Sequence, residues 1–376
     1  MYYIGIMSGT SVDGIDAVLV DFIEKYPFIK LIETLSVPFE ENLRSDIVKL
    51  LETFTIHLQK LGEIDHRLGL AYANAALILC EKAKINISSV VAIGCHGQTI
   101  FHDPRGKYPF TMQIGDSNII AAKTGISVVN DFRRLDMAFN GDGAPLTPVF
   151  NQCFLYSKNE KRAILNLGGI ANITILADLP SEVLGFDNGP ANCLMDLWIQ
   201  KKKGVKYDKN GDFARSGRAN TELLNRMLSE SYFMLPAPKS TGKELFNLPW
   251  LESILMDYSL VSDEDVQATL LDLTLKSLVN DIKKYCPKID ALYLCGGGAY
   301  NTYLVEKLKE SLGDVIIETT QKIGLHPQWM EAVAFAWFAK RRIEELPANL
   351  PSVTGANQLT LLGALYKSNK KVKYES

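Results

Sequence analysis

The chain begins with a pair of apolar strands joined by a short polar turn, a pattern that few folds accommodate. The turn reads Met7-Ser8-Gly9-Thr10-Ser11-Val12-Asp13-Gly14, and the flanking stretches, 4–6 and 15–22, are mostly apolar. Glycines 9 and 14 permit positive φ angles, and the hydroxyls and turn amides can hold an anion. Asp13 and Asp16 beside the turn suit a Mg²⁺ ion that accompanies a phosphate. The alternative is an ordinary hairpin with a glycine-rich turn.

The same pattern returns in the second half of the chain. Residues 162–176 again read as strand, glycine turn and strand, with Gly168-Gly169 in the turn and Asn172 just after it. This echo indicates two related domains, each offering one hairpin turn. Two such turns that face each other would hold the two ends of a polyphosphate, whereas two unrelated hairpins would not.

Strands and helices alternate along the rest of the chain, which predicts an α/β fold built on a central sheet. We expect further strands at 28–37, 90–94, 126–130, 182–184 and 291–295. We expect helices at 41–60, 63–84, 191–203, 263–285, 301–311, 327–344 and 358–367. The last helix is expected to pack back on the first domain, so that this domain is discontinuous in sequence.

Composition narrows the class of protein. The chain has 376 residues, of which 47% are hydrophobic and 22% charged, and a net charge of -3. That charge points to neither nucleic acid nor an anionic membrane surface, and no apolar run has the length of a membrane span. Six cysteines occur without a CxxC pair, which favours reduced thiols in a cytoplasmic protein over a disulfide framework or a zinc site.

A polar segment follows the buried strand 90–94 and contains His96, Gln98 and Thr99. Open α/β sheets bind ligands at the carboxyl ends of their strands. We therefore expect these three side chains to hydrogen-bond a substrate, with a purely structural role as the alternative. The spacing of His96 and His102 fits no metal site, and we predict no protein-held metal.

Asp187 follows the expected strand 182–184 and precedes the expected helix 191–203. A carboxylate at such a corner lies near the positive end of a helix dipole, which favours its ionised form. It can then act as a base toward water or a hydroxyl. A simple turn-capping role is the alternative.

Three later stretches add candidate ligand contacts. Gly296-Gly297-Gly298 lies between a strand and a helix, where a nucleotide can approach the backbone closely, although the stretch is not a GxGxxG dinucleotide motif. Glu331 begins an otherwise apolar helix, either stabilised by the helix dipole or facing a cleft. The loop 236–246 offers Lys239, Ser240 and Lys243 as polar contacts but fails the phosphate-loop pattern.

Taken together, these motifs resemble the anhydro-N-acetylmuramic acid kinase family of the sugar kinase, Hsp70 and actin superfamily. The resemblance covers nearly the whole chain and rests on stretches that occur in the family's order. They are 7–16, His96-Gly97-Gln98-Thr99, 165–172, Phe186-Asp187-Asn188-Gly189-Pro190, Lys239-Ser240-Thr241-Gly242, 295–299, 331–337 and 349–356.

The resemblance implies a two-lobed actin-like ATPase fold with an interlobe cleft, in which each lobe is a mixed sheet flanked by helices. It places residues 1–135 with 358–376 in the first lobe and 136–357 in the second. It implies an enzyme that opens the 1,6-anhydro bridge of its sugar with water and phosphorylates O6, using ATP and Mg²⁺, during peptidoglycan recycling. A kinase of the same fold acting on another sugar or small acid is the alternative, and a homodimer is compatible with either.

By the same resemblance, the ATP-binding loop is the stretch from Gly9 to Asp16. Asp187 resembles the family's general base, and Glu331 resembles a sugar-site carboxylate. The chain departs from the family pattern at Asp142, where Gln is usual, and at Gln328, where Asp is usual. The residues of the ATP-binding loop are Gly9, Thr10, Ser11, Val12, Asp13, Gly14, Ile15 and Asp16.

Overall fold

The computed structural model describes residues 1–9, 12–23 and 29–368. The chain divides into two compact units, Met1–Phe154 with Trp329–Ser376 (unit 1) and Leu155–Gln328 (unit 2). These boundaries differ from the lobes expected from the sequence, which divide at 135/136 and at 357/358. The difference arises because residues 136–154 and 329–357 make their contacts within unit 1, as the hydrogen bonds of Asp136 below illustrate.

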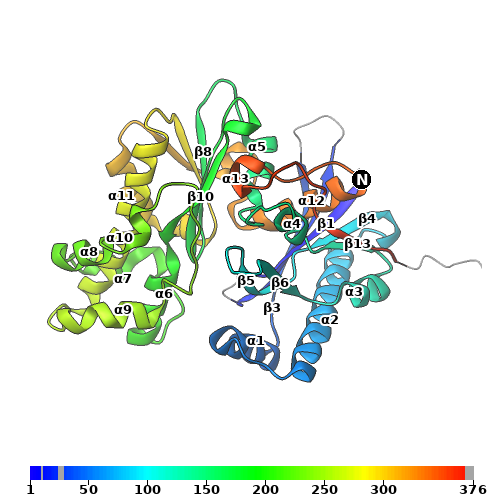
Figure 1. Ribbon diagram of the computed structural model, residues 1–376, viewed down its shortest axis with the longest axis horizontal. Helices are drawn as coiled ribbons and strands as arrows, with labels where there is room; N and C mark the ends of the chain where they lie inside the picture. Colours follow the sequence, from blue (N-terminus) through cyan, green and yellow to red (C-terminus); the bar gives the residue numbers. More distant parts are fainter. Residues whose placement is uncertain (10–11, 24–28, 369–376) are drawn as a thin grey trace, which may run out of the picture. The chain divides into compact units, whose positions relative to one another are not determined.

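Unit 1 is built on a six-stranded mixed sheet with the order β13-β7-β4-β1-β2-β3 (Figure 1). β1 runs antiparallel to β2, as β2 does to β3, and it runs parallel to β4, which is in turn parallel to β7. The strands are β1 (Tyr2–Met7), β2 (Gly14–Phe22), β3 (Ile29–Pro38), β4 (Val90–Cys95), β7 (Ser127–Asn130) and β13 (Ala364–Tyr366). The predicted helix 358–367 is therefore wrong, because β13 pairs with β7 and completes the edge of the sheet.

Helices cover this sheet, and a two-stranded hairpin stands beside it. In α2, residues Leu68, Tyr72 and Leu79 are fully buried on one face, as the helical spacing predicts. The helices are α1 (Glu41–Thr53), α2 (Leu58–Lys82), α3 (Ser117–Thr124), α4 (Arg134–Ala138), α5 (Thr147–Leu155), α12 (Met330–Ile343) and α13 (Pro351–Thr354). The hairpin consists of β5 (Gln98–Asp103) and β6 (Phe110–Ile114).

Helix α12 lies directly against β1 and β4 because those strands carry glycines at the crossing. A Cβ added to Gly5 would stand 1.8 Å from the carbonyl oxygen of Ala332, and one added to Gly94 would stand 1.9 Å from that of Phe335. No side chain fits in either place, so the two glycines set the distance between helix and sheet. That contact also fixes the first turn of α12, where Glu331 lies.

Unit 2 repeats this topology in a five-stranded sheet with the order β10-β9-β8-β11-β12 (Figure 1). β8 is antiparallel to β9 and parallel to β11, just as β1 is antiparallel to β2 and parallel to β4. The outer strands repeat the pattern of unit 1, since β10 is antiparallel to β9 and β12 is parallel to β11. The strands are β8 (Arg162–Leu167), β9 (Ile170–Ile175), β10 (Leu184–Pro190), β11 (Ala291–Cys295) and β12 (Ile316–Thr319). The two glycine turns expected from the sequence thus occupy equivalent places, between the first two strands of each sheet.

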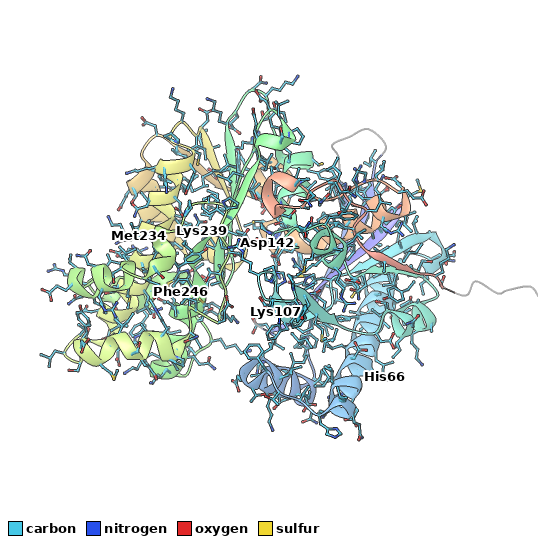
Figure 2. The ribbon with its side chains drawn as sticks, in the orientation of Figure 1. His66, Lys107, Asp142, Met234, Lys239 and Phe246 are labelled. Carbon is cyan, nitrogen blue, oxygen red and sulfur yellow. The ribbon has the colours of Figure 1, made fainter. Side chains whose placement is uncertain are left out.

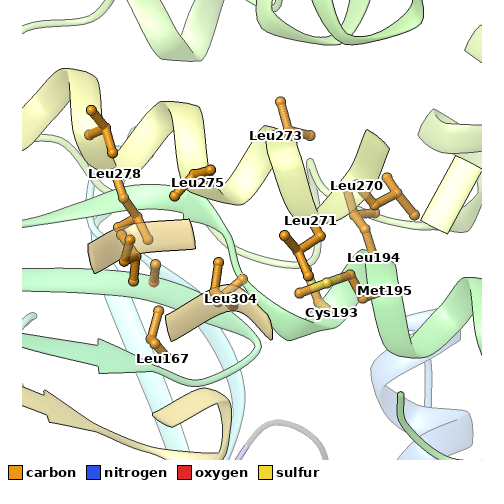
Figure 3. Packing of buried hydrophobic residues seen from close by; sticks show 14 of the residues in the cluster. Leu167, Cys193, Leu194, Met195, Leu270, Leu271, Leu273, Leu275, Leu278 and Leu304 are labelled. Atoms are coloured by element: carbon orange, nitrogen blue, oxygen red, sulfur yellow. The ribbon is translucent and has the colours of Figure 1, made fainter. Parts of the chain in front are cut away.

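The core of unit 2 lies on one face of this sheet and is dominated by leucines. Figure 3 shows the leucines of α10 beside Leu194 of α6 and Leu304 of α11. Ser262 caps α10 by accepting a hydrogen bond from the backbone N–H of Asp265 at 3.2 Å. The helices are α6 (Asn192–Lys203), α7 (Asp212–Ser216), α8 (Thr221–Leu228), α9 (Leu248–Leu255), α10 (Asp263–Tyr285) and α11 (Thr302–Leu312).

Candidate functional site

The turn between β1 and β2 is held by side chains from elsewhere in unit 1. Ser8 is buried, and its hydroxyl lies 2.7 Å from that of Tyr72 and 3.3 Å from the carbonyl oxygen of Gly97. The Gly9 carbonyl accepts from the backbone N–H of Val12 at 3.2 Å and from the amide of Gln98 at 3.3 Å. Gln98, which was predicted to bind substrate, is fully buried and supports the turn. Thr10 and Ser11 lie outside the described residues.

Gly14 has a different role in this turn from the positive φ angle predicted from the sequence. Among residues 12–14, Val12 has a positive φ, at 57°, and Gly14 does not, so the prediction that Gly14 supplies one is wrong. Gly14 is needed instead for close approach, because a Cβ there would stand 2.5 Å from the carbonyl oxygen of Val37. Val12 and Ile15 are buried side chains, so any contact that these two residues make with a ligand comes from their backbone.

Two carboxylates stand next to the turn. Asp13 is exposed and Asp16 is half-buried. Burial raises the pKa of Asp16, a hydrogen bond with Ser36 lowers it, and the negative charge of Asp13 raises it further. A cation bound between phosphates and these groups would relieve that repulsion, so the residues present fit a magnesium ion brought by a nucleotide. Within the described ranges, no cluster of His, Cys, Asp and Glu could hold a metal alone.

The carboxyl end of β4 brings together His96 and Arg133. The His96 Nε2 atom accepts hydrogen bonds from the Arg133 guanidinium at 2.9 and 3.3 Å. Burial, and secondarily the charge of Arg133, hold the pKa of His96 well below its usual range, so the ring is neutral. Burial also lowers the pKa of Arg133 to about 10, against the charges of Glu331 and Asp136. The Thr99 hydroxyl accepts from Gln113 at 3.2 Å.

Arg133 is the residue of this group that the sequence did not single out. It lies in the charged stretch 131–136 after β7, and its only signal was that position behind a strand. It joins His96 to Glu331 electrostatically and also donates to the carbonyl oxygen of Gly143 at 2.8 Å. Arg133 thus links two of the predicted substrate residues of unit 1, His96 and Glu331.

Buried Asp136 ties the neighbouring loops into unit 1. One carboxylate oxygen accepts from the side chains of Asn349 and Thr354 at 2.8 and 2.9 Å, and the other accepts from the backbone N–H of Gly143 at 2.9 Å. These bonds join the loop 139–145 to the segment 349–357. Asp142 in that loop, labelled in Figure 2, forms an ion pair with Arg105 at 3.0 Å.

In unit 2 the turn between β8 and β9 is joined to the start of α6. The Gly169 carbonyl accepts from the backbone N–H groups of Ala191 and Cys193 at 2.9 and 3.0 Å, and the Gly168 carbonyl accepts from that of Asn192 at 3.0 Å. Neither glycine has a positive φ, and a Cβ on Gly169 would meet nothing closer than 3.7 Å. The turn therefore has room for a Cβ at Gly169, in ordinary contact with Cys193 and Lys243.

The triplet after β11 contains glycines of two kinds. Gly296 has φ +76°, and a Cβ there would stand 2.4 Å from the side-chain oxygen of Asn166. A Cβ on Gly298 would stand 2.7 Å from the Leu167 Cβ. Gly297, by contrast, is exposed and has nothing within 4 Å. The outer two glycines are required by packing against β8, whereas the middle one leaves free space at the surface.

Asp187 lies inside a strand and not at the corner expected from the sequence. β10 runs over Leu184–Pro190, and Asp187 pairs with Asn172 of β9, which pairs with Asn166 of β8. Directly paired residues share one face of a sheet. Phe186 and Leu167 belong to the core cluster on the opposite face, so this polar row of Asp187, Asn172 and Asn166 faces away from the helices of unit 2.

The Asp187 carboxylate is half-buried, and one of its oxygens is fixed. Oδ2 accepts from the Ser240 hydroxyl at 2.8 Å and from the backbone N–H of Thr241 at 3.0 Å. Burial raises the pKa of Asp187 to about 6, these two hydrogen bonds lower it, and Glu244 raises it. The predicted dipole stabilisation of the ionised form is therefore wrong in sign, because desolvation outweighs it.

Lys239 was expected to offer a ligand contact, and this prediction is wrong. The side chain is buried, with 5% of its surface exposed, and its Nζ atom lies 3.7 Å from the carboxylate of Asp281. Lys243, in contrast, is exposed, and its Cε atom lies 3.7 Å from the position of a Cβ on Gly169. Of the three polar residues proposed for this loop, Ser240 contacts Asp187 and Lys243 borders the glycine turn.

A polar cavity of about 340 Å³ lies elsewhere in unit 1. Its main polar groups already have partners there: Asp65 accepts from the backbone N–H of Gly115 at 2.6 Å, Asp116 caps α3, and Asn130 donates to Ser117 at 2.8 Å. It is lined by Asp65, Gln113, Gly115, Asp116, Ser117, Asn118, Asn130, Asp131, Arg134 and Tyr366. None of the predicted site residues lines it, and the groups with chemistry to offer remain those around Asp187 and the glycine turns.

No helix in the described part of the chain has the length and apolar character needed to span a membrane.

Comparison with known proteins assigns the chain to a family. A family model described as anhydro-N-acetylmuramic acid kinase matches residues 1–368. A protein of that name from Pasteurella multocida (strain Pm70) is 49% identical over 374 residues, which are 99% of this chain and 98% of that protein. Its namesake from Haemophilus influenzae (strain ATCC 51907 / DSM 11121 / KW20 / Rd) is 46% identical over 380 residues, covering 97% of each.

A likeness among solved structures is weaker. Component A of (R)-2-hydroxyglutaryl-CoA dehydratase from Acidaminococcus fermentans matches with a TM-score of 0.49 and 11% identity, over 90% of this chain and 97% of that one. The sequence relatives and the family model carry the assignment, and they confirm the resemblance inferred from the motifs. The chain therefore belongs to the anhydro-N-acetylmuramic acid kinase family.

Proposed function

We propose that this protein is an ATP-dependent kinase that opens the anhydro bridge of 1,6-anhydro-N-acetylmuramic acid with water and phosphorylates O6. The product would be N-acetylmuramic acid 6-phosphate, formed in the cytoplasm during peptidoglycan recycling. The full-length relatives are named for this activity. The single observation that carries the proposal is Asp187, a half-buried carboxylate with one oxygen fixed and a pKa raised to about 6.

In the proposed reaction, Asp187 accepts a proton from water while the water oxygen bonds to C1 of the sugar. The C1–O6 bond breaks, and O6 keeps the electron pair. O6 then bonds to the γ-phosphorus of ATP, and ADP leaves. The proton passes from Asp187 to solvent. A base with a pKa near 6 accepts a proton more readily than an ordinary aspartate and is still mostly ionised at pH 7.

The nucleotide is assigned to the glycine turns and the triplet after β11. Unit 1 supplies the loop from Gly9 to Asp16, and unit 2 supplies Gly168, Gly169, Asn172 and 296–298. The open space at Gly297 and the room for a Cβ at Gly169 support this assignment, because those glycines have no packing reason to lack a side chain. Mg²⁺, held beside Asp13 and Asp16, would neutralise phosphate charge. That the two turns face each other across a cleft stays a prediction.

The sugar is assigned to the polar group of unit 1. His96 is held neutral, so it can serve the sugar as a hydrogen-bonding group without adding a charge. Gln98, Thr99 and Glu331 complete the set predicted from the sequence, and Arg133 joins it through its bonds to His96. Arg133 also supplies a positive charge that suits the carboxylate of the sugar's lactyl group.

The competing function is a kinase of the same fold that phosphorylates a free hydroxyl of another sugar or small acid. The departures from the family pattern at Asp142 and Gln328 favour testing this alternative, since both residues belong to stretches assigned to the sugar site by resemblance. The two functions differ in whether water enters the product, because only the opening of an anhydro bridge consumes a water molecule.

The test is a rapidly quenched reaction with ATP in ¹⁸O-labelled water, comparing the anhydro sugar with N-acetylmuramic acid and glucose. The proposal expects phosphorylation of the anhydro sugar, with one ¹⁸O atom in the product by mass spectrometry. The Asp187→Asn variant should lose at least ~10²-fold in turnover while it still binds ATP. Phosphorylation of glucose or N-acetylmuramic acid in preference to the anhydro sugar would refute the substrate, and near-normal turnover of Asp187→Asn would remove Asp187 from its role.

A further inference from the structure

Beneath Asp187 lies a buried polar cluster that the proposed reaction does not use. It consists of Lys239, Asn188 and Asp281, whose exposed fractions are 5%, 0% and 9%. Lys239 lies in the loop that follows η4 (Ser231–Met234), Asn188 in β10, and Asp281 in α10 (Lys239 is labelled in Figure 2). Burying charged groups is costly, so a cluster of this kind has to be held by specific contacts.

Asn188 and Lys239 both contact the carboxylate of Asp281. Asp281 Oδ2 accepts a hydrogen bond from the Asn188 amide at 3.0 Å and lies 3.7 Å from the Lys239 ammonium. The ammonium also lies 4.9 Å from the ring centroid of Tyr232, a cation–π contact. The Tyr232 hydroxyl in turn donates to the carbonyl oxygen of Asp187 at 2.7 Å. Through Asp281, helix α10 thereby contacts both the strand that carries Asp187 and the loop that contacts Asp187.

These two segments are the ones whose register sets the geometry of the base. Asn188 directly follows Asp187, and Lys239 directly precedes Ser240 and Thr241, the two donors to Asp187 Oδ2. The segments are also joined at the backbone, where the Asp187 N–H donates to the Lys239 carbonyl at 2.9 Å. A shift of the loop by a fraction of a residue would break both hydrogen bonds to Oδ2.

We propose that Lys239 and Asp281 are positioning residues, whose buried ion pair locks the loop 239–241 against β10 so that Ser240 and Thr241 fix one oxygen of Asp187 and leave the other to accept a proton. This inference rests on the proposed role of Asp187 as the base. It concerns two residues that touch neither the sugar nor the nucleotide in that proposal.

The pH dependence of the reaction reports on this lock. A base works only when ionised, so kcat/KM falls as the pH drops through its pKa. The charged groups around Asp187 are Glu244 and Lys239 from the loop and Asp281, with Lys284 beside it, from α10. The titratable but uncharged Tyr232 of η4 also faces it. The two hydrogen bonds at Oδ2 favour the ionised form, so releasing them raises the pKa and moves the acid limb to higher pH.

The deciding experiment uses the full-length double variant Lys239→Met/Asp281→Leu, with Lys239→Met alone beside it. The single variant leaves a buried carboxylate without its partner and is expected to lose stability. The double variant removes both charges, and replacing a whole buried pair by apolar groups is often neutral. The matched control is Lys307→Met, which breaks the 2.6 Å ion pair between α11 and Asp272 of the same helix α10.

We expect the double variant to fold, with a melting temperature below that of the wild type because the buried Asn188 amide loses its acceptor, and with its acid limb in kcat/KM moved up by about one pH unit. For a pKa that rises from about 6 to about 7, activity falls about fivefold at pH 6 and hardly at pH 8. Ser240→Ala, an exposed substitution that removes one donor directly, should move the limb in the same direction. The Lys307→Met control should keep the wild-type limb.

A wild-type acid limb in the folded double variant overturns the inference, as does a limb that moves equally in Lys307→Met. If the double variant does not fold, Ser240→Ala and Lys239→Met decide: an unmoved limb in both overturns the inference. Asp187→Asn is measured in parallel. If it keeps its activity, the proposed base is wrong, whereas an inactive Asp187→Asn beside an unmoved limb in the double variant refutes the positioning role alone.

Discussion

Three single substitutions in the glycine triplet after β11 separate packing from ligand binding. Gly296→Ala places a Cβ 2.4 Å from the side-chain oxygen of Asn166, at a residue with φ +76°. Gly298→Ala places one 2.7 Å from the Leu167 Cβ. Gly297→Ala places one in open space, with nothing within 4 Å. The three changes add the same methyl group to neighbouring residues, so they differ in the surroundings of that group and, at Gly296, in the backbone conformation.

The expected magnitudes follow from these distances. Overpacking costs about 1–3 kcal/mol, which we expect for Gly298→Ala. Gly296→Ala adds about 1–3 kcal/mol, because the backbone of Gly296, at φ 76° and ψ 174°, lies in a region that essentially only glycine occupies. A unit of the size of 155–328 loses about 2–4 °C in Tm per kcal/mol. Gly297→Ala should change stability by less than about 0.5 kcal/mol, yet weaken ATP binding about tenfold or more, which is about 1.4 kcal/mol.

Calorimetric melting curves and titration of each variant with ATP and Mg²⁺ provide the two measurements. The expected pattern is a lowered Tm for Gly296→Ala and Gly298→Ala, and an unchanged Tm with weakened ATP binding for Gly297→Ala. If Gly297→Ala binds ATP as the wild type does, the free space beside Gly297 is not part of the nucleotide site. If it melts as early as Gly298→Ala, the reading of the triplet from its packing is wrong.

Further predictions concern carboxylates of both units. Activity should fall as the pH drops through about 6, because Asp187 must be ionised, and a pH–kcat/KM profile measures this. Glu244→Gln should move that acid limb to lower pH, since the Glu244 charge raises the pKa of Asp187. Folding raises the pKa of Asp187 above the ordinary 3.8, so the stability that protonated Asp187 contributes is lost as the pH rises through about 6. At pH 8 the Asp187→Asn variant should therefore melt no earlier than the wild type. Asp136→Asn replaces one carboxylate oxygen by an amide NH₂ group, so an acceptor becomes a donor. If this group takes the place of Oδ2, it faces the Gly143 N–H, and the free energy of unfolding in urea should fall by about 1–3 kcal/mol. For Asp142→Asn, whose ion pair is exposed, that free energy should fall by at most about 1 kcal/mol.

The local elements and the family could be predicted from residue order alone. Hairpins with glycine turns, an amphipathic helix such as α2 and the capped start of α10 depend on neighbours within a few positions, and the structure shows them near the expected residues. The repeated hairpin correctly indicated two units of one topology. Motifs in the family's order identified the family, because each of them is a local string of residue types.

Contacts between distant segments decided the rest. The three-residue strand β13 looked like a helix because its pairing with β7 lies more than 230 positions away in the chain, outside any local pattern. Burial decided that Lys239 faces Asp281 instead of a ligand, and that Asp187 has a raised pKa although a corner near a helix would lower it. The cost of removing a charge from water depends on which atoms surround it in three dimensions, and the order of residues does not specify that environment.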